Sequence, residues 1–82
     1  MIKFTLVLES KAEDGSLGDR TLEKEMEWPI VPRIGEQFNL EGNSASVANV
    51  DHDFPRGKIF VYAHVDDLEF DSLVGLAGYV QS

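Results

Sequence analysis

The sequence predicts a mainly β protein of the α+β class, a small five-stranded antiparallel, partly open barrel with one C-terminal helix. Three observations support this fold class. In residues 20–28, apolar or long-stemmed residues alternate strictly with Glu23, Glu25 and Glu27, the period of a strand with one buried and one solvated face. Residues 2–8 repeat that alternation. Near the C-terminus, apolar residues recur instead at helical spacing.

The first two strands are expected at about residues 2–9 and 20–28, joined by a polar loop over residues 10–19. The register that keeps both apolar sets on one face gives three cross-strand pairs: Leu8 with Leu22, Phe4 with Met26, and Lys3 with Glu27. Lys24 falls on the apolar face, where its stem can pack while its ammonium group reaches water at the sheet edge.

The next segment, residues 28–35, contains Pro29 and Pro32 and is expected to cross between strands, because proline does not fit a central strand. A short strand over residues 36–40 follows. Gly42 and Asn43 predict a tight turn, which would place Leu40 opposite Ala45 and Phe38 opposite Val47. The parity of Val47 and Val50 differs, so a β-bulge is expected near Ala48 or Asn49.

A strand over residues 58–65 is predicted after a loop at residues 54–57. Asp66 then suits a helix N-cap, with Glu69 completing a capping box. Apolar spacing extends the helix over about residues 67–77, ended by Gly78 in a left-handed conformation, although Gly75 is unfavourable inside a helix. The alternative is that residues 76–80 form a closing sixth strand.

Composition narrows the classes of function. The 82 residues suffice for one domain, residues 1–82. The absence of cysteine excludes disulfides, thiolate metal ligands and a thiol nucleophile. A net charge of −8 argues against direct nucleic-acid binding, which depends on basic side chains; its ordinary role is solubility. The sequence shows no apolar stretch typical of a signal peptide or membrane span, so we expect a cytoplasmic protein without membrane contact.

The order of elements resembles a known family at the level of pattern. A proline-flanked segment precedes Gly35-Glu36-x-Phe38-x-Leu40, a tight turn, Val47-x-x-Val50 and Ile59-x-Val61, and Phe70-x-x-Leu73 comes before Gly78-Tyr79. Over about residues 29–79 this is similar to small SH3-like β-barrel proteins of bacteria and phages with no known function. The resemblance implies a fold, and such folds host many unrelated functions.

Catalytic and metal chemistry find little support. Asp51, His52 and Asp53 form a His/carboxylate cluster, but the expected hairpin places His52 and His64 five or six residues apart, beyond one coordination sphere. No nucleophile or phosphate-binding motif occurs. We therefore predict no catalytic residues, no metal, no cofactor and no enzymatic activity.

The strand over residues 58–65 is apolar on both faces. Phe60 and Tyr62 lie on the face opposite Ile59, Val61 and Ala63. The ordinary explanation is that the C-terminal helix covers one of these faces. If the helix packs elsewhere, Phe60 and Tyr62 become a protein-binding patch, because aromatic residues are enriched in interface cores.

The row Glu23, Glu25 and Glu27 is the other candidate. Alternate residues of a strand lie about 6.6 to 6.8 Å apart, a spacing comparable with that of phosphates along one DNA strand. A rigid carboxylate row can therefore imitate a nucleic-acid edge, although an ordinary solvated strand face is the simpler explanation. A second acidic cluster, Asp66, Asp67, Glu69 and Asp71, would need to line the same surface.

We therefore expect a non-enzymatic protein-interaction domain, a small acidic β-barrel that binds another protein. The expected contact residues are Phe60, Tyr62 and Trp28, with Glu23, Glu25 and Glu27 shaping electrostatic complementarity. The alternative is a nucleic-acid-mimicking inhibitor of a basic nucleic-acid-binding protein, and the second alternative is a small metal-dependent enzyme. An exposed edge strand would also allow a homodimer.

Overall fold

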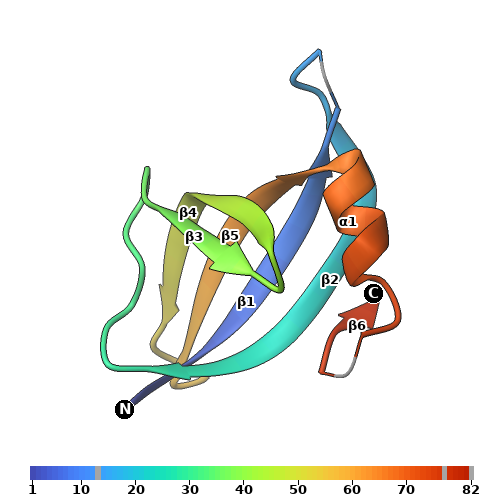
Figure 1. The fold of residues 1–82 in the computed structure, drawn as a ribbon. Helices are drawn as coiled ribbons and strands as arrows, with labels where there is room; N and C mark the ends of the chain where they lie inside the picture. Colours follow the sequence, from blue (N-terminus) through green and yellow to red (C-terminus); the bar gives the residue numbers. More distant parts are fainter. Residues whose placement is uncertain (13, 77, 82) are drawn as a thin grey trace.

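The computed structural model describes residues 1–12, 14–76 and 78–81, and it is mainly β with one short helix (Figure 1). The helix α1 spans Asp67–Leu73. The strands, in chain order, are β1 (Ile2–Lys11), β2 (Leu17–Trp28), β3 (Gln37–Leu40), β4 (Asn43–Asp53), β5 (Lys58–Asp66) and β6 (Val80–Gln81). The prediction of five strands is wrong, because a short sixth strand follows the helix.

All the strands of the described residues belong to one sheet with the order β3-β4-β5-β1-β2-β6. The sheet is strongly curved, and it does not close, since β3 and β6 form its two edges (Figure 1). The expectation of purely antiparallel pairing is also wrong, because β1 pairs with β5 in parallel, with Leu6 opposite Val61. This pairing makes β1 a central strand, and a central strand is expected to bury residues on both faces.

The β1–β2 ribbon has the predicted register. Phe4 lies opposite Met26 and Leu8 opposite Leu22. Both strands extend beyond the predicted bounds, to Lys11 and back to Leu17. Lys24 lies on the apolar face, as predicted, and its Nζ lies 4.4 Å from the centre of the Tyr79 ring.

The β3–β4 hairpin turns one residue earlier than predicted, which shifts each cross-strand partner by two residues. Glu41 and Gly42 occupy the turn with φ of 51° and 85°, which is the backbone of a type I′ turn. Leu40 therefore faces Asn43, and Phe38 faces Ala45. The Gly42 N–H donates to the Asn39 side-chain oxygen at 2.9 Å, a local hydrogen bond that helps to fix this register.

The β4–β5 hairpin agrees with the prediction. Asp53 faces Lys58 and His52 faces Ile59. The register shifts between Val47 and Asn49, which is the expected bulge. It allows Val47 and Val50 to face the same side of the sheet although their parity differs.

The helix α1 is shorter than predicted. It ends at Leu73, and Gly75 follows in the left-handed region with φ of 88°, so this glycine ends the helix rather than interrupting it. Asp66 occupies the N-cap position but makes no side-chain capping hydrogen bond, so the predicted capping box does not form. Ala77 lies outside the described residues. A helix and a sixth strand thus both occur, but the strand lies at Val80–Gln81 and not over residues 76–80 as in the alternative prediction.

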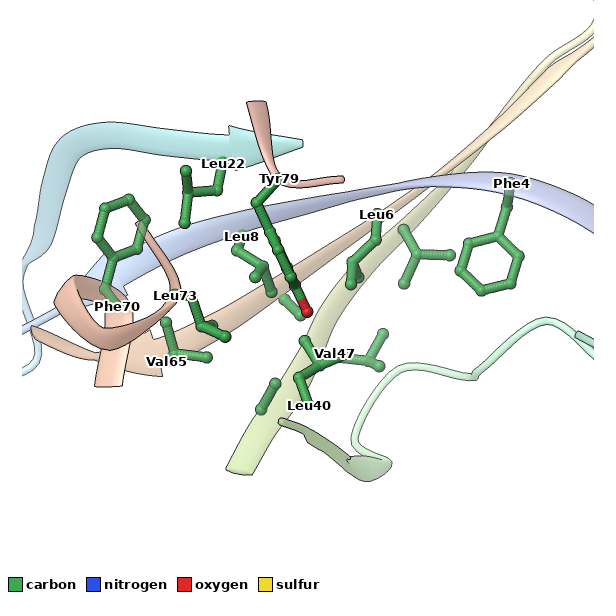
Figure 2. Close-up of a cluster of buried hydrophobic side chains, with 13 residues drawn as sticks. Phe4, Leu6, Leu8, Leu22, Leu40, Val47, Val65, Phe70, Leu73 and Tyr79 are labelled. Carbon is green, nitrogen blue, oxygen red and sulfur yellow. The ribbon is translucent and has the colours of Figure 1, made fainter. Parts of the chain in front are cut away.

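The hydrophobic core lies on the concave side of the sheet (Figure 2). Phe70 and Leu73 of α1 are fully buried there against β1 and β5. In the view of Figure 2, Tyr79 lies between Leu8 and Leu6, and its hydroxyl end is directed toward Val47 and Leu40. The other buried members of this cluster are Phe4, Leu22, Ala45, Val61, Ala63 and Val65. The helix therefore covers the side of β5 that carries Val61, and leaves the opposite side to other contacts.

Candidate functional site

The side of the sheet opposite the core brings the two predicted groups of residues onto one surface, here called the outer face. Its central residues are Phe60, Tyr62 and His64 of β5, Thr5, Val7 and Glu9 of β1, and Thr21, Glu23, Glu25 and Glu27 of β2. The pairing register arranges them in rows across the strands. One row runs from Phe60 through Thr5 to Glu25, and the next from Tyr62 through Val7 to Glu23.

The distance between the aromatic and acidic groups follows from the sheet. Neighbouring strands lie about 4.8 Å apart, so Phe60 and Glu25 are separated by roughly 10 Å at the backbone. The side chains of Phe60 and Glu25 are long enough to extend over β1, the strand between β5 and β2. The aromatic pair and the glutamate row therefore lie close enough for one partner segment to contact both.

Phe60 and Tyr62 form an aromatic pair on β5. Their ring centroids lie 6.5 Å apart, and the planes are inclined by 31°. Both side chains are half-buried. Their neighbours on β1, Thr5 and Val7, are only 5% and 8% exposed, yet Val7 does not belong to the core cluster. We attribute the burial of Thr5 and Val7 to the longer side chains that flank them on β5 and β2.

Glu23, Glu25 and Glu27 of the outer face differ in their hydrogen bonds and ion pairs. The Thr5 hydroxyl donates to Glu25 Oε1 at 2.9 Å. Lys3 Nζ lies 3.7 Å from Glu27 Oε1 in a solvent-exposed ion pair. Glu23 makes no ion pair within the described part of the chain. The Glu25 carboxylate is therefore held by Thr5, whereas the Glu23 carboxylate has no ion pair in the described residues and can bind a partner.

A histidine and a carboxylate close one end of the outer face. His64 Nε2 lies 3.8 Å from Glu9 Oε1, and the two side chains are 22% and 26% exposed. The pair follows from the parallel register, which sets Glu9 opposite His64. This contact was not predicted from the sequence, because only antiparallel pairing was expected, whereas the contact depends on the parallel register of β1 and β5.

Trp28 lies apart from Phe60 and Tyr62. It shares the parity of Leu22 and Met26, and hence the concave side of β2, at the end of the strand. It is 37% exposed. It lines a small hollow with Ile30, Pro32, Glu36, Gln37 and Phe38. The structure therefore does not bring the three predicted aromatic contact residues together.

The second acidic cluster is divided, because Asp66 ends β5 opposite Lys11 whereas Asp71 lies on the helix. Arg20 Nη2 lies 2.9 Å from Asp71 Oδ1, and the Arg20 guanidinium carbon lies 4.8 Å above the Phe70 ring. Phe70 belongs to the core, on the side of the sheet away from the outer face. Asp71 therefore does not extend the glutamate row.

The Asp51-His52-Asp53 cluster is divided by the strand. Asp51 pairs with Phe60 and joins the outer face, whereas His52 pairs with Ile59 and points to the other side. His64 pairs with Ser46, at the far end of the ribbon. Within residues 1–12, 14–76 and 78–81, no three His, Asp or Glu side chains are grouped to hold a metal ion.

One buried polar group lies in the core rather than on the outer face. The Tyr79 hydroxyl is buried and has no hydrogen-bond partner in the part of the chain that the structure describes. Burial raises the pKa of this hydroxyl above its ordinary value, and the charge of Glu41 raises it further. The group therefore stays neutral in the folded protein at physiological pH.

Comparison with protein-family models, with curated proteins and with solved structures finds no match to this chain. Among the helical segments that the structure describes, none has the length and apolar character required to cross a bilayer. The site must therefore be interpreted from its own geometry.

Proposed function

We propose that the protein is a non-enzymatic interaction domain that binds another protein through its outer face. The observation that supports this most directly is the position of α1, which packs against the concave side and leaves Phe60 and Tyr62 half-buried on the other. Two neighbouring rings beside a carboxylate row give an apolar centre and a polar margin. That arrangement is typical of protein–protein interfaces.

The test compares the wild-type protein with a Phe60→Ser, Tyr62→Ser variant, each immobilised and incubated with lysate of the source organism or its host. Retained proteins are then quantified by mass spectrometry over a series of salt washes. We expect a protein that the wild type retains and the variant loses. A Leu17→Ser variant is the matched control, because Leu17 is an exposed apolar residue elsewhere on β2.

Circular dichroism and thermal unfolding show whether the Phe60→Ser, Tyr62→Ser variant is folded, which the comparison of retained proteins requires. A variant that folds but retains the same proteins as the wild type would contradict the proposal. A variant that fails to fold would show that the two rings belong to the structural core, and the patch hypothesis would fail with it.

A second function, imitation of a nucleic acid, is favoured by one observation, which is that Glu23, Glu25 and Glu27 follow one face of one strand. A basic nucleic-acid-binding protein would then be the partner, and its binding would weaken at high salt. Replacing the three glutamates by glutamine tests this idea. Unchanged affinity in the triple variant would exclude it.

The partly open barrel and the SH3-like family stay predictions. The strong curvature of the sheet and the proline-containing crossing between β2 and β3 support them. The six strands and the parallel β1–β5 pair distinguish this sheet from the one expected. Pairing of two copies through the free edge of β3 likewise stays a proposal, which the molecular mass in solution would test.

A further inference from the structure

The charges of the outer face are strongly unbalanced. Alternation along the strands assigns Asp51 and Asp53 of β4 and Lys58 of β5 to the same face as Phe60. Among the described side chains, the face then carries seven carboxylates, from Glu9, Glu23, Glu25, Glu27, Asp51, Asp53 and Asp66, and three lysines, Lys3, Lys11 and Lys58. The imbalance favours a cationic partner and opposes a second copy of the same face, a nucleic acid or an anionic membrane.

Several of these charges already have partners. Lys3 pairs with Glu27, and Arg56 pairs with Asp53 at 3.1 Å. Glu23 and Asp51 have no ion-pair partner among the described residues. The register places them on opposite sides of the aromatic pair, Asp51 next to Phe60 on β4 and Glu23 beyond Val7 on β2. A cation above the rings would have a carboxylate on either side.

The rings favour a particular kind of cation. A guanidinium group is planar, stacks on aromatic faces and binds carboxylates through two parallel hydrogen bonds. The Phe60 and Tyr62 centroids lie 6.5 Å apart. In an extended chain, side chains on one side recur about every 6.6 to 6.8 Å. The spacing of the rings thus matches arginines at alternate positions.

We propose that the outer face binds an extended protein segment with arginine at every second position, the two guanidinium groups stacking on Phe60 and Tyr62 between Asp51 and Glu23. This proposal rests on the proposed function and specifies the chemistry of its partner. It requires no movement of the backbone, because both rings already lie on the side of the sheet that α1 does not cover.

The experiment measures fluorescence anisotropy with three dye-labelled peptides of equal charge and length. The first alternates arginine with serine, the second alternates lysine with serine, and the third has its arginines adjacent. We expect the first peptide to bind about threefold more tightly than either control, the size of an exposed cation–π contact. Equal affinity for all three peptides would overturn the proposal.

Protein variants locate the site. Phe60→Leu with Tyr62→Leu keeps apolar bulk but removes the aromatic faces, and should weaken binding of the first peptide about threefold. The variant Asp51→Asn with Glu23→Gln should also weaken binding of the first peptide, by a factor that grows as the salt concentration is lowered. The matched control is Asp67→Asn with Glu69→Gln, which removes the same charge at α1. Equal losses in the two charge variants would indicate nonspecific attraction and overturn the proposal.

The two proposals fail in different ways. Capture of a lysate protein that depends on Phe60 and Tyr62, without binding of the first peptide, would retain the interaction function and overturn the arginine inference. Capture that is independent of the rings, together with no peptide binding, would overturn both. If only the Phe60→Leu, Tyr62→Leu variant lost its fold, the two charge variants, which change solvent-accessible groups, would decide the arginine inference.

Discussion

Both sides of β5 carry apolar residues, but the two sides are used differently. Val61, Ala63 and Val65 are at most 2% exposed and pack beneath α1, whereas Phe60 and Tyr62 on the other side stay half-buried. The larger side chains thus lie on the less covered side. Side-chain size therefore does not determine which side of a strand becomes the core; in β5 the core side is the one whose residues are all apolar and that the helix covers.

The largest loss of stability is expected for a substitution on the core side of the sheet. Phe70→Ala removes a side chain with no exposed surface that joins α1 to the sheet. We expect a loss of about 3 to 5 kcal/mol in the free energy of unfolding, which approaches the total stability expected for so small a domain. Urea unfolding followed by circular dichroism measures it, and a loss below that of the outer-face variant would reverse the comparison.

The outer-face variant Phe60→Ser, Tyr62→Ser should cost less. Each ring keeps part of its surface in contact with water, so we expect a combined loss of roughly 2 to 3 kcal/mol, less than full burial of two such side chains contributes. The same urea experiment checks this value. A cost equal to that of Phe70→Ala would assign both sides of β5 to the core.

The register of the β1–β2 ribbon could be read from the sequence because both strands alternate without interruption and one face of each is apolar. A shift by one residue would have buried Glu23 and Glu25. The bulge near Val47 was predictable for the same reason. The glutamate row and the aromatic pair were each identified from this alternation.

Their common location was not predictable from the sequence. Their common location depends on the parallel pairing of β1 with β5. No local sequence pattern indicates this pairing, because it joins two segments that are far apart in the chain. The turn at Glu41 and the helix end at Gly75 were misplaced for another reason. In each case a neighbouring Gly-Asn pair or glycine offered an equally good local signal.

The hydrogen bond between Thr5 and Glu25 provides a finer test of the outer face. Thr5→Val keeps the shape but removes the hydroxyl donor, and should cost about 1 kcal/mol. Glu25→Gln retains an acceptor oxygen and is the control. A double-mutant cycle measured by urea unfolding isolates the pair, and a coupling energy near zero would show that the contact does not stabilise the fold.

The smallest effect at neutral pH is expected for Tyr79→Phe. The variant removes a buried hydroxyl without a described partner, so stability at pH 7 should be unchanged or up to about 1 kcal/mol higher. Because the folded state raises the pKa of Tyr79, the wild type should lose stability as pH rises above about 10, where the unfolded tyrosine ionises. Urea unfolding at pH 7 and above pH 10 should show a smaller alkaline loss of stability in Tyr79→Phe than in the wild type. An identical loss in the two proteins would contradict this prediction.

The central position of β1 has a consequence for the time course of folding. The β1–β2 ribbon can form as soon as Trp28 is available, but the other edge of β1 stays open until β5 has been added more than thirty residues later. Contacts between such distant segments slow folding, because a long loop must close before they form. During synthesis, the exposed edge of β1 is therefore the place where a chaperone or a wrong strand would bind first.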